Sequence, residues 1–241
     1  MKTTPDQLQK VFSKVDPHDP IALLEFAVEQ FKGRIALACS FSMEDAALID
    51  IIASHSLPIE VFALDTGRLN EETYLCAEQI RLKYKLSINW FFPEAKAVEK
   101  LEQKKGLFSF KENIENRKEC CSIRKVEPLG RALAGLDAWI TGQRREQSIT
   151  RAELDVVEYD RTNALPKLNP LATWSLKQVE HYIKEHKVPC NSLYLQGYTS
   201  IGCAPCTRAI HEGEDERAGR WWWENPEHKE CGLHLHVVNE K

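Results

Sequence analysis

A chain of 241 residues with a net charge of −4 argues against two broad classes of function. A general nucleic-acid binder needs an excess of Lys and Arg, whereas this chain carries 32 basic and 36 acidic side chains. No run approaches the roughly 20 apolar residues that span a membrane, and the first residues do not open a signal peptide. We therefore expect a cytoplasmic protein whose 8 cysteines serve metal binding or catalysis rather than disulfides.

Hydrophobic periodicity predicts strands that alternate with helices. Two N-terminal helices are predicted within residues 6–32, at 6–15 and 20–32. Apolar runs predict buried strands at 35–39, 59–64, 87–92 and 136–140. Helical spacing recurs at 46–53, 71–84, 94–105 and 175–187. This alternation is typical of an α/β fold with a doubly wound, mostly parallel sheet.

A change in composition in the C-terminal third of the chain predicts a boundary between a domain and a C-terminal tail. Residues 154–171 are expected to be extended, with Pro166 and Pro170 confining them to edges or loops. The chain becomes strongly polar after about residue 207. We expect one nucleotide-binding α/β domain over residues 1–206 and a mobile tail over 207–241, docked by the tryptophans at 221–223.

Polar residues follow the first two predicted strands, where open α/β sheets bind ligands. Ser40-Phe41-Ser42 lies between a strand and a helix N-terminus, a setting that suits a phosphate group. A serine-rich turn before a helix is also common as a plain N-cap. Leu64-Asp65-Thr66 ends the second strand and is the other candidate binding segment.

Basic residues form two further candidate anion sites. Residues 113–128 carry a dense basic cluster that includes Lys125, and the alternative is an ordinary solvated helix face. Thr141-Gly142-Gln143-Arg144-Arg145 follows the fourth strand, where paired arginines suit a phosphate or sulfate. Arginine pairs are also commonplace on protein surfaces.

Four cysteines in two pairs predict a metal centre. Cys203 and Cys206 have a spacing that both zinc and iron–sulfur proteins use, whereas Cys120 and Cys121 are adjacent. Neighbouring side chains diverge, so they converge poorly on one zinc ion. A 4Fe-4S cluster offers each sulfur a separate iron and is favoured. The alternatives are zinc, buried apolar cysteines, and a thioredoxin-type redox pair.

Cys231 lies outside that quartet in a polar stretch, where an inert core cysteine would be out of place. A nucleophilic cysteine must be a thiolate, which nearby cations stabilise. Arg217 and Arg220 precede it and can serve either the thiolate or an anionic substrate. We expect Cys231 to be a catalytic thiol on the mobile tail.

The chain resembles the assimilatory adenylyl-sulfate (APS) reductases, the cluster-bearing branch of the phosphoadenylyl-sulfate (PAPS) reductase family. The resemblance covers nearly all the chain from about residue 33. It depends most on the segments at 120–126, 197–206 and 230–234, with support from 64–68 and 141–145. Ser42 departs from the family pattern, because the loop usually has glycine there.

The resemblance implies an adenine nucleotide α-hydrolase-like fold and a specific site. The adenosine is expected near residues 40–42 and 64–66, and the phosphosulfate on Lys125, Arg144, Arg217 and Arg220. The family's cluster ligands correspond to Cys120, Cys121, Cys203 and Cys206.

The implied reaction is the thioredoxin-dependent reduction of APS to sulfite and AMP in sulfate assimilation. Cys231 attacks the sulfur, AMP leaves, and thioredoxin or a glutaredoxin-like donor releases sulfite from the S-sulfocysteine. Homo-oligomers are common in the family. Two alternatives remain open: a PAPS reductase with a metal site, and a non-catalytic iron–sulfur module that binds adenylate.

Overall fold

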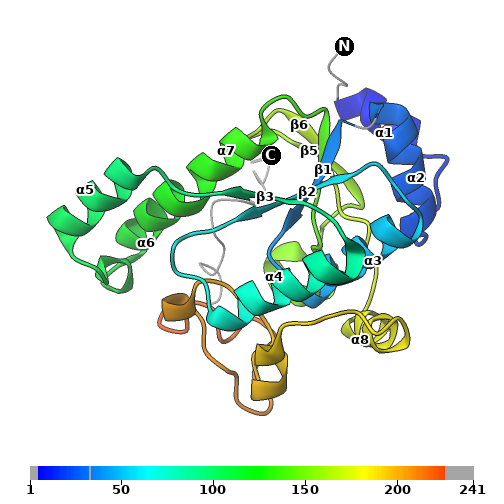
Figure 1. Cartoon of the computed structure of the whole chain (residues 1–241). Coiled ribbons are helices and arrows are strands. Elements are labelled where there is room, and N and C mark those ends of the chain that lie inside the picture. Colours follow the sequence, from blue (N-terminus) through cyan, green and yellow to red (C-terminus); the bar gives the residue numbers. More distant parts are fainter. Residues whose placement is uncertain (1–4, 33, 226–241) are drawn as a thin grey trace.

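The computed structural model describes residues 5–32 and 34–225. Its centre is a six-stranded sheet in the order β3-β2-β1-β4-β6-β5 (Figure 1). β5 runs antiparallel to β6, and every other neighbouring pair in this sheet is parallel. The predicted doubly wound, mostly parallel α/β sheet is therefore confirmed.

The elements have the following bounds. The strands are β1 Ile35–Cys39, β2 Glu60–Leu64, β3 Ile88–Phe91, β4 Ala138–Ile140, β5 Val157–Asp160 and β6 Leu165–Leu168. The α-helices are α1 Pro5–Phe12, α2 Pro20–Phe31, α3 Met43–Ser54, α4 Glu71–Tyr84, α5 Ala95–Lys105, α6 Ile114–Cys121, α7 Glu127–Leu133 and α8 Leu176–Glu185. A π-helical turn, Ser122–Val126, joins α6 to α7.

Strand β1 is apolar throughout because helices cover both faces of the sheet. Successive side chains of a strand point to opposite faces. Ile35 and Leu37 accordingly join the large core that includes residues of α1 to α4. Ala36 faces the other way and packs in a smaller core with Leu129 of α7 and Trp139 of β4. Burial on both faces accounts for the continuous apolar pattern of this strand.

The expectation that proline would keep residues 154–171 at an edge or in loops was wrong for β6. This strand contains Pro166 and lies between β4 and β5. Its pairing with β4 begins only at Lys167, so the missing N–H of Pro166 falls outside that ladder. β5, which pairs Tyr159 with Pro166, is the edge strand instead.

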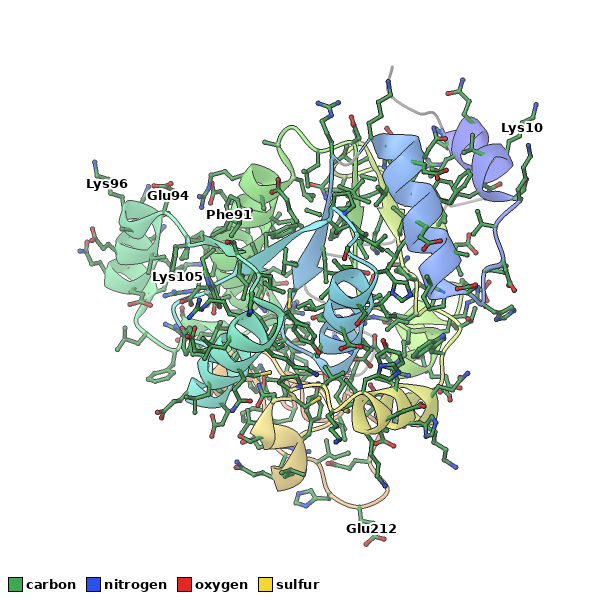
Figure 2. All side chains as sticks on the ribbon, turned by 45° about the vertical axis from the view of Figure 1, so that its right-hand side comes forward. Lys10, Phe91, Glu94, Lys96, Lys105 and Glu212 are labelled. Atoms are coloured by element: carbon green, nitrogen blue, oxygen red, sulfur yellow. The ribbon has the colours of Figure 1, made fainter. Side chains whose placement is uncertain are left out.

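The helices α5 and α6 project from one side of the sheet. Figure 2 shows charged side chains of α5, among them Lys96 and Lys105, on this projection. The helices in the described residues are too short or too polar to cross a membrane.

Residues 207–225 belong to the segment expected to be a mobile tail, and they pack against the domain. Thr207 forms a bridge with Arg220, and Trp221 is fully buried. Glu224 forms a buried ion pair with Arg117 of α6, at 2.8 Å. Residues 226–241 lie outside the described part of the chain.

Candidate active site

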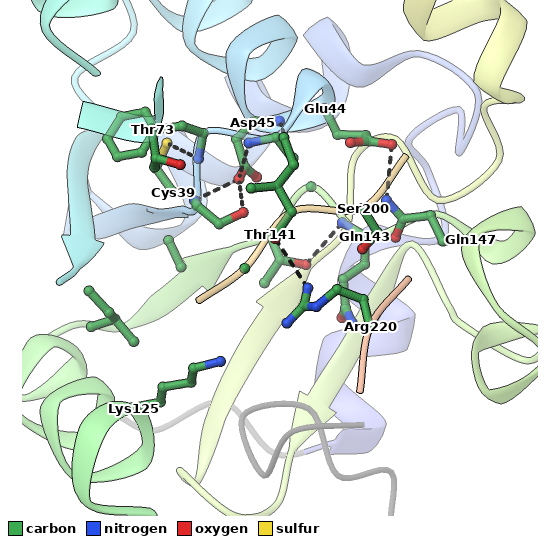
Figure 3. Close-up of a pocket in the computed structure, with 18 of the residues that line it drawn as sticks. Cys39, Glu44, Asp45, Thr73, Lys125, Thr141, Gln143, Gln147, Ser200 and Arg220 are labelled. Carbon is green, nitrogen blue, oxygen red and sulfur yellow. Dashed lines mark hydrogen bonds between the residues drawn. The ribbon is translucent and has the colours of Figure 1, made fainter. Parts of the chain in front are cut away.

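A cavity opens beside the carboxyl ends of β1, β2 and β4, as Figure 3 shows. The parallel strands of the sheet bring these three chain segments together, although they are far apart in sequence. Most of the predicted substrate-binding residues line it: Ser40, Phe41, Ser42, Leu64, Thr66, Lys125, Arg217 and Arg220. Asp65 and Arg144, in contrast, are not among the described residues of its lining.

The loop after β1 is shaped by a buried carboxylate. Asp45 accepts hydrogen bonds from the backbone N–H and hydroxyl of Ser40, both at 2.7 Å. The hydroxyl of Ser42 caps α3 by accepting from the Asp45 N–H at 3.2 Å. Burial raises the pKa of Asp45 above its ordinary value. The expected N-cap is thus present, and the hydroxyl proton of Ser42 can still donate to a ligand.

The strained residue of this loop is Phe41, which has φ of +61°. Ser42, where the resemblance implied glycine, has an ordinary φ of −68°. A left-handed conformation is unfavourable for phenylalanine and needs support from its surroundings. That support comes from burial, because the Phe41 ring is 1% exposed and stacks 5.6 Å from the ring of Trp90.

The loop after β4 approaches the loop after β1 very closely. A Cβ atom at Gly142 would lie 2.5 Å from Asp45 Oδ1 and 2.9 Å from Glu44 Cβ. Only glycine therefore fits at this position without moving the wall of the cavity.

Asp65 and Thr66 point in different directions from the end of β2. Asp65 Oδ1 accepts the N–H of Gly67 at 2.7 Å and the hydroxyl of Tyr74 at 3.0 Å, so this side chain organises the turn. Thr66 lines the cavity, and its hydroxyl lies 3.2 Å from the sulfur of Cys203. Substrate contact by Asp65 stays a prediction.

Cationic side chains converge on the cavity around a buried tryptophan. Lys125 comes from the π-helical turn, and its Nζ lies 5.7 Å from the centre of the Trp221 ring. The Arg220 guanidinium lies 4.7 Å from the same ring. A Cβ at Gly202 would come within 2.3 Å of Arg220 Nη2, so a larger residue there would displace the guanidinium. The ring face attracts both cations and holds them beside the cavity.

Arg151, and not the predicted Arg144, is the arginine of this region that lines the cavity. Arg144 is fully buried, and its Nε donates to Glu44 at 2.7 Å while its Nη2 donates to Glu216 at 3.1 Å. Arg151 lines the cavity, and its Nη1 donates to Gln147 at 2.5 Å. Arg151 was not predicted from the sequence, because it lies beyond the Arg144-Arg145 pair in a short 3-10 turn.

All four predicted metal ligands gather around a second, smaller cavity. Its lining includes Cys120, Cys121, Cys203 and Cys206. Lys125 and Cys203 line both cavities, so the cysteine cavity adjoins the larger one. The two cysteine pairs, distant in sequence, are therefore brought together as a metal centre requires.

These cysteines offer only soft sulfur donors, which suit iron–sulfur clusters and zinc. No group of three or more His, Cys, Asp or Glu side chains in residues 5–32 and 34–225 has the geometry of a site for one metal ion. Sulfurs that each bind a different iron of a 4Fe-4S cluster need not converge on one point. The donor set fits a cluster, and the cluster itself stays a prediction.

The electrostatic environment differs among the four thiols. Burial alone would raise the pKa of Cys203, but the Lys125 ammonium and the Thr66 hydroxyl hold it below the ordinary value. Burial raises the pKa of Cys206 to about 12, with a further contribution from Cys203. The cations therefore outweigh burial at Cys203 but not at Cys206. Cys231, the predicted nucleophile, lies outside the described residues.

The fold and the cavity together define an adenine nucleotide α-hydrolase-like protein. The chain belongs to the PAPS/APS reductase family, since the model of the phosphoadenosine phosphosulfate reductase domain matches residues 34–209. Membership makes it an oxidoreductase that acts on a sulfur group.

Curated relatives support this family assignment. The chain is 53% identical over 200 residues to an adenosine 5'-phosphosulfate reductase of Allochromatium vinosum, covering 83% of this chain and 78% of that protein. A protein of the same name from Burkholderia cepacia is 50% identical over 205 residues, covering 85% and 82%. The chloroplastic 5'-adenylylsulfate reductase 3 of Arabidopsis thaliana is 43% identical over 98% of this chain and 53% of its own length.

Solved structures agree with the fold. A PAPS reductase from Candida auris, in a phosphate complex, superposes with a TM-score of 0.70 at 27% identity, over 85% of this chain and 95% of that chain. An FMN adenylyltransferase from Candida glabrata gives a TM-score of 0.56 at 15% identity, over 98% of this chain and 80% of that chain. The second likeness shows only the fold.

Proposed function

We propose that this chain reduces adenylyl sulfate to sulfite and AMP in sulfate assimilation, with thioredoxin or a glutaredoxin-like protein as the dithiol donor. The observation that carries this proposal is the junction of the two cavities at Lys125 and Cys203. It sets a cavity lined by Lys125, Arg217 and Arg220 directly against four clustered cysteines. The names of the similar curated proteins support adenylyl sulfate over the 3'-phosphorylated nucleotide.

The nucleotide would bind across the carboxyl edge of the sheet. Its adenosine would lie near Ser40-Phe41-Ser42 and Leu64-Asp65-Thr66. Its phosphosulfate would be held by Lys125, Arg217 and Arg220, which line the cavity. We place Arg151 in this group rather than Arg144, because Arg144 is already paired with two carboxylates, the buried Glu44 and the half-buried Glu216. Fixed cations offset the charge that builds on a transferred sulfonate.

The chemistry would be two successive displacements. The Cys231 thiolate attacks the sulfur, the bond between sulfur and the bridging oxygen breaks, and AMP leaves with that oxygen. A thiolate of the donor then attacks Cys231 Sγ and expels sulfite. The donor's second thiol closes its disulfide, which frees Cys231 and supplies the two electrons that reduce the sulfur.

A 4Fe-4S cluster would be held by Cys120, Cys121, Cys203 and Cys206, and when bound it would polarise the adjoining anion pocket. Two protein side chains also contribute to the region between the cluster and the nucleotide. Thr66 and Lys125 stand between the cysteine cavity and the nucleotide cavity. We expect the protein to act in the cytoplasm.

The test is anaerobic incubation of the full chain with adenylyl sulfate, first without and then with thioredoxin. Without the donor, we expect one equivalent of AMP and a sulfonate on the Cys231 peptide by mass spectrometry. With the donor, sulfite should form continuously, and a Cys231→Ser variant should form none. An unmodified Cys231 peptide without AMP release would instead support the non-catalytic module. A faster rate with the 3'-phosphorylated nucleotide would support a PAPS reductase, and an iron and sulfide count tests the cluster.

A further inference from the structure

Gln143 presents a buried donor to the nucleotide cavity. It follows β4, lines the cavity in Figure 3, and is only 4% exposed. Its Nε2 has no hydrogen-bond partner within the part of the chain that the structure describes. Buried polar groups are nearly always paired in folded proteins. An unpaired amide in the wall of a binding cavity therefore indicates a partner on the ligand.

The orientation of that amide is imposed from behind by Lys167. The Lys167 Nζ lies 2.6 Å from Gln143 Oε1 and 2.6 Å from Glu158 Oε1. Lys167 is 3% exposed and also lies over the Trp139 ring, at 5.6 Å. An ammonium group can only donate hydrogen bonds, so the Gln143 atom that meets it must be the oxygen. The Gln143 oxygen and nitrogen therefore cannot exchange places, and Nε2 is fixed at the other end of the amide.

We propose that Gln143 binds the substrate by donating from Nε2 to a phosphosulfate oxygen, and that Lys167 is the positioning residue that fixes the amide. This inference rests on the proposed function. The non-bridging oxygens of an anion only accept hydrogen bonds, so they match a donor that cannot turn. A ribose hydroxyl both donates and accepts, and it would pair with either amide orientation. Fixing the amide as a donor is therefore of use for an anionic oxygen, whereas a hydroxyl would gain nothing from it.

A second donor on the same cavity strengthens the argument. Arg220 Nε is buried and likewise has no hydrogen-bond partner among the described residues. Arg220 lines the cavity together with Gln143, and its Nη1 is bound to the carbonyl of Ile201 at 3.1 Å. Unpaired donors from two separate chain segments predict a ligand rich in acceptor oxygens.

The decisive variant is Gln143→Glu, which keeps the shape of the side chain and replaces the donor with a carboxylate oxygen. The Lys167 ammonium gains a full charge partner, so the melting temperature should stay level or rise. The affinity for adenylyl sulfate should fall by about 10- to 100-fold, as expected for a lost hydrogen bond to a charged group. Because the new carboxylate also repels any anion in the cavity, Gln143→Met, which removes the donor without adding a charge, is titrated beside it and should lose affinity as well. A purely structural role would leave the affinity of the uncharged Gln143→Met variant intact.

Calorimetric titration of the anaerobic holoprotein with adenylyl sulfate measures this effect, with Gln103→Glu on the exposed face of α5 as the matched control. The control should bind like the parent. A Gln143→Glu variant that also binds like the parent overturns the inference and leaves the proposed function standing. A parent that neither binds nor turns over adenylyl sulfate removes the proposed function, and this inference with it.

A double-mutant cycle tests the positioning role of Lys167. Lys167→Met should weaken binding when residue 143 is Gln and have much less effect in Gln143→Met, where no amide needs orienting. Equal effects in both backgrounds would refute the positioning role. If Lys167→Met fails to fold because Glu158 is left unpaired, the Gln143→Glu titration still decides the substrate contact.

Discussion

The hydroxyl of Thr66 lies 3.2 Å from the sulfur of Cys203 and connects the nucleotide cavity to the cysteine cavity. Both residues are buried, so this contact operates away from water, where hydrogen bonds are electrostatically stronger. Thr66 lies two residues beyond the end of β2, and Cys203 comes from the distant C-terminal loop. The two halves of the proposed site therefore meet in one contact between side chains.

We expect a Thr66→Val variant to slow sulfite formation by about fivefold, because it removes one hydrogen bond of about 1 kcal/mol without changing side-chain shape. Steady-state rates and the visible absorption of the anaerobic protein measure the effect. Thr207→Val is the matched control, since its hydroxyl bonds the backbone carbonyl of Cys203 at 3.0 Å and not the sulfur. An unchanged rate and spectrum in Thr66→Val would contradict this role.

Phe41 should be essential to the loop after β1. A Phe41→Ala variant loses a buried ring and its stacking on Trp90, which costs about 3–5 kcal/mol of unfolding free energy. Nucleotide affinity should fall with it, because the left-handed φ of +61° is no longer held by packing. Denaturant unfolding and AMP titration test both effects. Phe108→Ala, at a ring that is 60% exposed, should change stability far less.

Substitutions of Arg144 and Arg151 should affect different properties, stability for Arg144 and enzymatic activity for Arg151. Arg144→Met leaves the buried carboxylate of Glu44 without its cation, so it should lower the unfolding free energy by about 3–5 kcal/mol. Arg151→Met should reduce sulfite formation more than it reduces stability, because Arg151 lines the cavity. Thermal unfolding and kinetics on both variants test the assignment. The reverse pattern would return the substrate contact to Arg144.

Glu214 should contribute stability that disappears in acid. The Arg208 guanidinium, with the His211 N–H, holds the pKa of Glu214 at about 2, below its ordinary value of 4.5. The folded state therefore favours the ionised carboxylate, and this contribution is present above pH 4.5 and lost as pH falls toward 2. Melting curves of the parent and Glu214→Gln should differ near neutral pH and converge in this acidic window. A constant difference across the window would show that the ion pair is not responsible.

Local patterns of apolar residues in the sequence predicted most of the sheet and its covering helices. The apolar runs that became β1, β2, β3 and β4 and the helical segments between them predicted a mostly parallel sheet, because burial on both faces leaves a continuous hydrophobic signal. The same patterns placed the strand ends, and so predicted Ser42 and Thr66 at one edge. β5 and β6 were not separated, since a proline signal hid the strand that contains Pro166.

By itself, the amino-acid sequence determined the fold class, the strand edge that forms the cavity, and the four cysteines of the proposed metal centre. Periodicity and motif spacing are properties of neighbouring residues, and they can be recognised without coordinates. Only the tertiary structure decided that Arg144 is buried between carboxylates while Arg151 and Gln143 face the cavity. Those roles depend on which distant side chains pack behind each residue, and linear spacing does not record that packing.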